Sequence, residues 1–83
     1  MVKKVLILDV PGCASCKYAE ALIAQIKKEE KLQFSVEVKD ITKHPDILQK
    51  YQVMSSPGIV IDGKLKFTGR PQEKELRNAL KKD

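Results

Sequence analysis

Two short runs of consecutive apolar residues, 5–8 and 59–61, constrain the fold of this chain more than any other feature. The first run is Val-Leu-Ile-Leu and the second is Ile-Val-Ile. A strand covered on both faces loses the alternation of apolar and polar residues, and both runs are too short for a typical helix. The two runs therefore predict the central strands of a sheet with layers on both of its faces.

Two other segments, residues 32–38 and 64–68, alternate apolar with polar residues. Alternation is typical of a strand covered on one face, so both segments are predicted to be edge strands. Their outward lysines and polar residues would discourage edge-to-edge pairing. The side chains predicted to face inward are Leu32, Phe34, Val36 and Val38 in the first segment and Leu65 and Phe67 in the second.

Three further segments have the helical spacing of apolar residues. The first runs from Ala14 to about Glu29, the second starts near Pro45, and the third starts near Pro71. Asp62-Gly63, between the last two strands, predicts a tight antiparallel hairpin. The chain is therefore predicted to be α/β, with the order strand, helix, strand, helix, strand, strand, helix. Its four-stranded mixed sheet, flanked by helices, would have the strand order 2-1-3-4, with the first two strands parallel.

The length and composition indicate the class of protein. With 83 residues, the chain is predicted to form a single domain spanning residues 1–83. Its two cysteines are too few for a disulfide-stapled secreted scaffold. Lys3-Lys4 before an apolar run superficially resembles a signal peptide, but Asp9 interrupts the run and no cleavage site follows. Since no stretch approaches transmembrane length, we expect a cytoplasmic protein with no membrane partner.

The chain is basic, with a formal net charge of +5 from 16 Lys and Arg against 11 Asp and Glu. A nucleic-acid-binding surface would require a basic stripe with aromatic or groove-reading residues nearby. Here the basic residues are spread over separate elements and mixed with acidic ones. We therefore expect no nucleic-acid partner and a solvated basic surface that is compatible with acidic protein partners.

The cysteine pair Cys13-Ala14-Ser15-Cys16 lies between the first predicted strand and the first predicted helix. At a helix N-terminus the unpaired backbone N–H groups and the helix dipole favour negative charge, which a thiolate supplies. Helix-terminal cysteines in such motifs typically have pKa values of about 3.5 to 7.5, against about 8.5 for a free thiol. Spacing of three residues also allows a small disulfide ring to close and reopen. The motif thus predicts reversible dithiol–disulfide chemistry.

Three separated features resemble the thioredoxin superfamily. They are the cysteine pair followed by Lys17, the segment Lys50–Pro57 leading into an apolar strand, and the Asp62-Gly63-Lys64 turn followed by a final amphipathic helix. The chain is most similar to the small thioredoxin-like "redox-active disulfide" proteins of microbes. The resemblance implies a minimal thioredoxin-like fold, a single thioredoxin/glutaredoxin-like domain, and thiol–disulfide oxidoreductase activity. It implies no cofactor beyond a redox-active Cys13–Cys16 disulfide.

The resemblance also implies roles for individual residues. Cys13 would attack a substrate disulfide and Cys16 would resolve the mixed disulfide. Pro57 would follow a cis peptide bond, and the backbone of Ser56 would pair with an extended substrate segment. Gly12, which replaces the Trp that commonly precedes the first cysteine in thioredoxins, is the third predicted substrate-binding residue. The implied partners are protein disulfides and a thioredoxin-reductase-type electron donor, and the implied state is a monomer.

Some residues depart from the thioredoxin pattern. The buried Asp that thioredoxins carry in the corresponding strand aligns with Ile7, and Asp9 is not a clean substitute. Proton transfer from Cys16 would then depend on Lys17 or water. The segment 68–71, Thr-Gly-Arg-Pro, lacks the Gly-Gly and acidic pair with which glutaredoxins hold glutathione, which disfavours glutathione as a substrate.

A soft-metal module of another class is the main alternative. The segment 12–16 is similar to the Cu(I)-binding loop of copper chaperone domains, and two thiolates suit Cu(I). Two features oppose this alternative: a final helix where that family has a strand, and Pro11 where it usually has Met. A structural zinc site would need four ligands, and only the two cysteines and His44 are candidates. A third interpretation is an adaptor that only binds other proteins. The side chains of Tyr18 and Tyr51 are predicted to pack within the fold.

Overall fold

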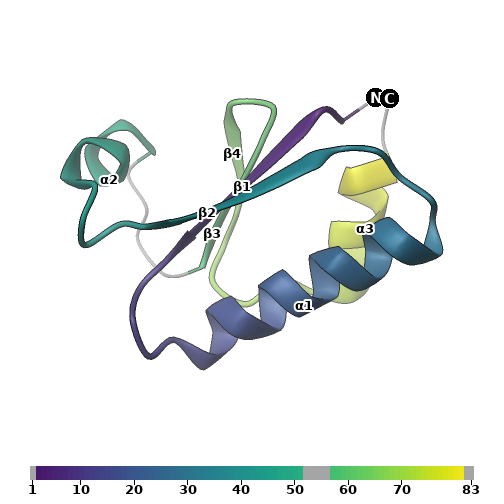
Figure 1. The fold of residues 1–83 in the computed structure, drawn as a ribbon, viewed down its shortest axis with the longest axis horizontal. Helices are drawn as coiled ribbons and strands as arrows, with labels where there is room; N and C mark the ends of the chain where they lie inside the picture. Colours follow the sequence, from purple (N-terminus) through teal and green to yellow (C-terminus); the bar gives the residue numbers. More distant parts are fainter. Residues whose placement is uncertain (1, 52–56, 82–83) are drawn as a thin grey trace.

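The computed structural model describes residues 2–51 and 57–81, in which the strands and helices follow the predicted order (Figure 1). The first helix has the predicted bounds, and the last begins two residues after the predicted Pro71. The elements are β1 (Lys4–Asp9), α1 (Ala14–Glu29), β2 (Ser35–Asp40), α2 (Pro45–Tyr51), β3 (Gly58–Ile61), β4 (Lys64–Thr68) and α3 (Glu73–Lys81).

The four strands form one mixed sheet in the order β2-β1-β3-β4, which confirms the predicted topology. β1 is parallel to β2 and antiparallel to β3, and β3 is antiparallel to β4. The two continuous apolar runs form the central strands, where each face of the sheet is covered. In the β3–β4 turn, Asp62 and Gly63 have φ angles of 49° and 85°, the left-handed conformation that a tight hairpin requires.

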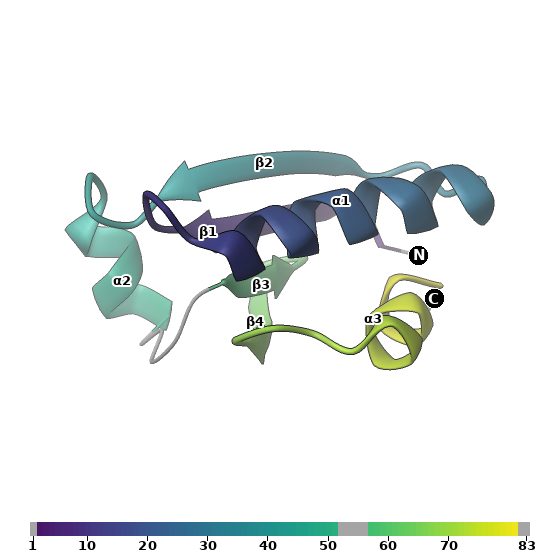
Figure 2. The same ribbon diagram turned by 90° about the horizontal axis from the view of Figure 1, so that it is seen from below.

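The helices divide the core into two layers, one on each face of the sheet. On one face α1 and α3 cover the larger cluster, to which Val5, Ile7, Ala19, Leu22, Ile23, Ile26, Ile59, Ile61, Leu76 and Leu80 contribute. On the other face, Ile47 and Tyr51 of α2 pack against a smaller cluster of Leu8, Ile41 and Val60. Figures 1 and 2 show α2 and α3 at opposite ends of the molecule. Because successive residues of β1 point to opposite faces, its apolar run supplies both layers.

The structure corrects the prediction for the first edge strand. Phe34 is buried, but Val36 and Val38 are 40% and 42% exposed instead of being buried in the core. Both valines lie beside the fully buried Val5 and Ile7 of β1 in the parallel register. Helix α1 covers the β1 residues but leaves these two valines uncovered. Alternation therefore predicted the correct face of the strand but not how far the helix covers it.

The second edge strand also differs from its prediction. Leu65 and Phe67 were predicted to face inward together, but Leu65 packs against the smaller cluster and Phe67 against the larger one. The reason is a register shift: Val60 pairs with Leu65 and Ile59 with Phe67, so Lys66 is an extra residue in β4. Such a β-bulge breaks the two-residue period of a strand, and here it turns the two side chains to opposite faces.

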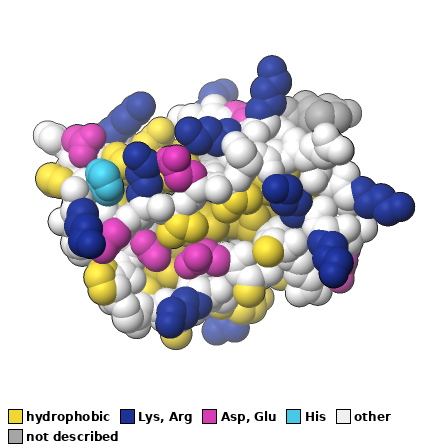
Figure 3. Space-filling view, in the orientation of Figure 1, with side chains coloured by type: hydrophobic (Ala, Val, Ile, Leu, Met, Phe, Trp, Pro, Cys, Tyr) yellow, Lys and Arg dark blue, Asp and Glu magenta, His cyan; other side chains and the backbone are white. Residues whose placement is uncertain are grey.

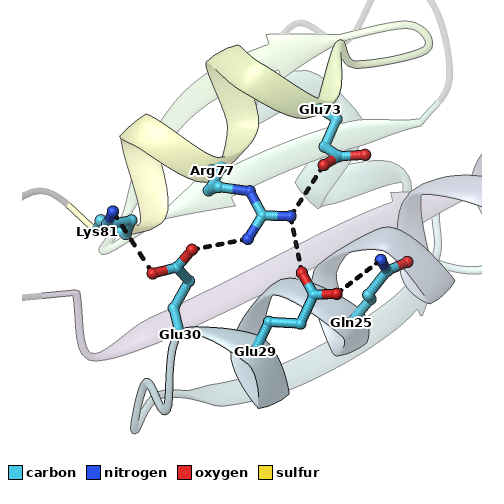
Figure 4. A network of polar contacts seen from close by, with 6 residues as sticks. All are labelled: Gln25, Glu29, Glu30, Glu73, Arg77 and Lys81. Carbon is cyan, nitrogen blue, oxygen red and sulfur yellow. Dashed lines mark hydrogen bonds and ion pairs between the residues drawn. The ribbon is translucent and has the colours of Figure 1, made fainter.

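An ion-pair network joins α3 to the end of α1 (Figure 4). The guanidinium of Arg77 donates hydrogen bonds to Glu30 at 2.7 Å, Glu29 at 2.8 Å and Glu73 at 2.9 Å. Lys81 lies 3.5 Å from the second carboxylate oxygen of Glu30. The Arg77 side chain is 22% exposed, which limits screening of these pairs by water. The network therefore fixes the polar side of α3 while Leu76 and Leu80 fix its apolar side.

This network predicts acid sensitivity of the fold. Hydrogen bonds from Gln25 and Arg77 hold the pKa of Glu29 below its ordinary value of 4.5, and Arg77 does the same for Glu30. Such carboxylates stabilise the fold at and above pH 4.5, and the stabilisation is lost as the pH falls below 4.5 through their lowered pKa values. We expect the thermal unfolding midpoint to fall on acidification, and to fall less in Arg77→Gln.

The matched control is Lys74→Gln, which removes one positive charge from an exposed position of the same helix. Its thermal midpoint should follow that of the unsubstituted protein at every pH. Part of the acid sensitivity should remain in Arg77→Gln, because Asp62 also has a lowered pKa from backbone N–H groups of Lys4 and Lys3. Parallel curves for Arg77→Gln and the unsubstituted protein would show that the network contributes nothing.

Candidate active site

A tight turn delivers the cysteine pair from β1 to α1. The backbone N–H of Cys13 donates to the carbonyl of Val10 at 3.3 Å and closes the turn over Pro11 and Gly12. Gly12 has a φ of 76°, and proline followed by a left-handed glycine is the residue pattern of a type II turn. A Cβ at Gly12 would meet no atom within 4 Å, so the constraint comes from the backbone conformation and not from crowding. The turn thus sets the position of Cys13.

Cys13 is the N-cap residue of α1. It has an extended backbone, with φ of −87° and ψ of 107°, and its Sγ accepts a hydrogen bond from the backbone N–H of Cys16 at 3.0 Å. The Cys13 carbonyl accepts from the N–H of Lys17 at 3.3 Å. A sulfur at this position lies at the positive end of the helix dipole. It accepts a hydrogen bond from a backbone N–H that has no partner within the helix. This geometry stabilises a thiolate at Cys13 when the pair is reduced.

The two cysteines form a disulfide, with their Cα atoms 5.2 Å apart. They differ in exposure: Cys13 is partly exposed, whereas Cys16 is 1% exposed and belongs to the buried residues of α1. An incoming thiolate or disulfide therefore meets the sulfur of Cys13 first. The difference in exposure follows from the helical turn between them, which places Cys16 on the inner face of α1.

The remaining predicted site residues are Lys17, Ser56 and Pro57. Lys17 is exposed on α1. Ser56 lies outside the described residues, and with it the peptide bond predicted to be cis. Pro57 is fully buried, and its carbonyl accepts a hydrogen bond from Gly69 at 2.9 Å. Pro57 thus anchors the start of β3 to the loop that follows β4.

One contact near the disulfide was not predicted from the sequence. The guanidinium of Arg70 lies 4.1 Å from the ring centroid of Tyr18, which is two residues beyond Cys16 in α1. Tyr18 also packs against the larger core cluster, as predicted. The stacking joins the loop before α3 to the first part of α1, with the positive charge that a cation–π contact requires. The two residues are far apart in sequence, so no local pattern could reveal this pair.

The described residues show no buried carboxylate that could assist Cys16. Ile7 lies fully buried in the core, Asp9 is half-buried at the end of β1, and no charged side chain in the described ranges is buried. Those ranges also contain no cluster of three or more His, Cys, Asp or Glu side chains that could hold a metal ion. None of the helices in them is long and apolar enough to cross a membrane.

Comparison with known proteins agrees with this geometry. A family model described as a thioredoxin domain (Thioredoxin_3) matches residues 1–81. A thioredoxin of Methanocaldococcus jannaschii is 29% identical over 79 residues, which cover 95% of this chain and 93% of the relative. A probable thioredoxin of Methanothermobacter marburgensis is 32% identical over 80 residues, which cover 96% of this chain and 94% of the relative.

Solved structures show the same fold. The oxidised mitochondrial thioredoxin 3 of Saccharomyces cerevisiae superposes with a TM-score of 0.72 at 22% identity and covers 94% of this chain and 76% of its own. Fasciola hepatica thioredoxin gives a TM-score of 0.69 at 25% identity, with 93% and 76% covered. The predicted thioredoxin-like fold is thereby confirmed. This chain belongs to the thioredoxin family and is a protein disulfide oxidoreductase.

Proposed function

We propose that this chain reduces disulfide bonds of other proteins and is itself re-reduced by a thioredoxin-reductase-type electron donor. The observation that carries the proposal is the asymmetry of the pair. The sulfur of Cys13 is partly exposed and accepts the N–H of Cys16, whereas Cys16 is 1% exposed. The pair itself carries the electrons, so no bound cofactor is needed. The cytoplasmic location stays a prediction.

The reaction has two exchange steps. In the first, the Cys13 thiolate attacks one sulfur of the substrate disulfide, a Cys13–substrate disulfide forms, and the other substrate sulfur leaves as a thiolate. In the second, Cys16 loses its proton and attacks Cys13, which forms the Cys13–Cys16 disulfide and releases the second substrate thiolate. Two electrons have then passed to the substrate, whose two thiolates take up two protons from solvent. A donor dithiol restores the pair by the reverse exchanges.

Supporting roles follow from the positions of the neighbouring residues. We assign Gly12 to the exposed turn over which a substrate segment passes to reach Cys13. The backbone of Ser56 is proposed to pair with that segment, and Pro57, which is fully buried, is proposed to complete this part of the binding site. The proton of Cys16 is proposed to pass to water, assisted by Lys17, which is exposed and lies one residue beyond Cys16.

Copper binding through the same two cysteines is the alternative. The last element that the structure describes is helix α3, whereas copper chaperone domains have a strand in that place. Position 11, where that family usually has Met, is a proline in an exposed turn. Both observations favour disulfide exchange.

The test is turnover of a protein disulfide such as that of insulin. We expect the chain, supplied with a thioredoxin reductase and its reductant, to accelerate the reduction by more than about a hundredfold over the uncatalysed exchange. Titration of the reduced protein with Cu(I) against a competing chelator gives the second arm. No acceleration together with tight, stoichiometric Cu(I) binding would replace the proposed function with the alternative.

A further inference from the structure

The edge strand β2 continues the apolar face of the sheet beyond the reach of α1. None of its residues is buried, and Val36 and Val38 are among the most exposed large apolar side chains of the described residues. Figure 3 shows hydrophobic side chains gathered in the middle of this face, between β2 and α1, with charged side chains around them. An edge of this kind is a template for pairing with another strand.

A groove of about 560 Å³ lies between α1 and the start of β2. Leu32 and Val36 contribute apolar surface to it. The lysines at 27, 28 and 31 contribute positive charge, which exceeds the single negative charge of Glu20. An occupant of this edge must therefore supply apolar side chains above the valines and negative charge near the lysines.

The backbone of β2 fixes which residues can pair at this edge. Ser35 donates its N–H to Lys3 and Ile41 donates to Asp9, both toward β1. Since N–H directions alternate along a strand, the odd-numbered residues point to β1. The N–H and C=O groups of Val36 and Val38 and the N–H of Asp40 therefore point to the free edge, while the carbonyl of Asp40 accepts from the N–H of Lys43 at 3.0 Å.

We propose that β2 pairs antiparallel with β2 of a second copy of this chain, on a two-fold axis through Val38. Val38 then lies opposite Val38 of the second copy in a hydrogen-bonded pair, and Val36 lies opposite Asp40. Glu37 comes directly opposite Lys39 of the second copy, twice about the axis. Opposite charges at such directly facing positions stabilise strand pairing.

Neighbouring registers lack this complementarity. An axis through Glu37 would place Glu37 opposite itself, and an axis through Lys39 would place Lys39 opposite itself. Like charges directly opposite are destabilising. Glu37 and Lys39 lie on the same face of β2, with their charged groups 3.7 Å apart. The charges that usually protect an edge strand thus favour one self-pairing register here.

The groove favours the same arrangement. Asp40 points to the same face of β2 as Val36 and Val38, since the three are two residues apart. In the proposed register, Asp40 of the second copy lies beside Val36, on the side where the groove lysines lie. A second copy therefore brings both a valine and a carboxylate to this surface. The sequence resemblance implied a monomer, and the exposed edge instead points to a reversible dimer.

The test is sedimentation equilibrium at about 0.15 M salt, which screens the net charge of the chain. An edge-to-edge contact smaller than about 1,200 Å² is a weak interface, so we expect association between about 10 μM and 1 mM. Glu37→Lys and Lys39→Glu should each raise the dissociation constant at least about tenfold, because each places like charges opposite one another. Lys66→Glu, on the opposite edge strand, is the matched control and should leave it unchanged.

Weakened association of both single variants identifies the register, and mixing the two variants tests whether opposite charges drive the pairing. Glu37→Lys presents two lysines and Lys39→Glu presents two glutamates, so an equimolar mixture should associate as a heterodimer although each variant alone is monomeric. The double variant should self-associate like the unsubstituted chain. The proposal is overturned if the unsubstituted chain stays monomeric at 1 mM, if the mixture does not associate, or if only an added Glu-rich peptide binds at this edge.

Discussion

Cys13→Ser is expected to lower the rate of protein disulfide reduction by more than about a thousandfold, to the uncatalysed background. Only a thiolate attacks a disulfide readily, and a serine hydroxyl at the same N-cap position stays protonated at neutral pH. The fold should be kept, because a serine Oγ can also accept the N–H that Sγ of Cys13 accepts. Turnover with a reductase, measured beside a thermal unfolding curve, checks both statements.

Cys16→Ser is the matched substitution, since it makes the same chemical change one helical turn further in. This variant should lose turnover as well, but it should accumulate a mixed disulfide between Cys13 and the substrate, because the resolving thiol is absent. Non-reducing electrophoresis and mass measurement detect the adduct. Equal residual activity in the two variants, or an adduct of equal yield on Cys16 in Cys13→Ser, would contradict the assigned order of attack.

Leu76→Ala is expected to destabilise the fold by about 2–5 kcal/mol. Leu76 is fully buried in the larger cluster, which joins α3 to α1 and to the central strands. Removing its side chain leaves a cavity that the surrounding residues fill only in part. Since a small domain has a total stability toward the lower end of about 5–15 kcal/mol, this loss is a large share of it. The free energy of unfolding in urea measures the effect.

Leu48→Ala provides the control for that experiment. Leu48 lies on α2 and is 39% exposed, so the same truncation should change the free energy of unfolding by no more than about 0.5 kcal/mol. Similar losses in the two variants would mean that α3 does not seal the core as its burial indicates.

The central part of the fold followed from the sequence because its signals are local. The apolar runs 5–8 and 59–61 became β1 and β3, and the Asp62-Gly63 turn formed the predicted hairpin. The exposure of the edge strands could not be predicted, because alternation does not show how far a helix extends over the sheet. Val36 and Val38 are exposed for that reason. The bulge at Lys66 had no signal in the sequence either.

Within the site, local chemistry predicted the position of Cys13 at the start of α1. The contacts that could not be predicted join residues that are distant in sequence. Arg70 stacks on Tyr18, and Arg77 bonds to the end of α1. Such pairs depend on the packing of complete helices and loops. The predicted roles of Ser56 and of the peptide bond before Pro57 stay predictions.

The most direct test of the account is the alkylation rate of each thiol in the reduced protein, measured against pH and resolved by peptide mass. We expect Cys13 to react faster than Cys16, and to reach half of its maximal rate well below pH 8.5, the ordinary pKa of a free thiol. Mild oxidant should then protect both thiols together. Two equally slow thiols that titrate near pH 8.5 and never form a disulfide would contradict the account.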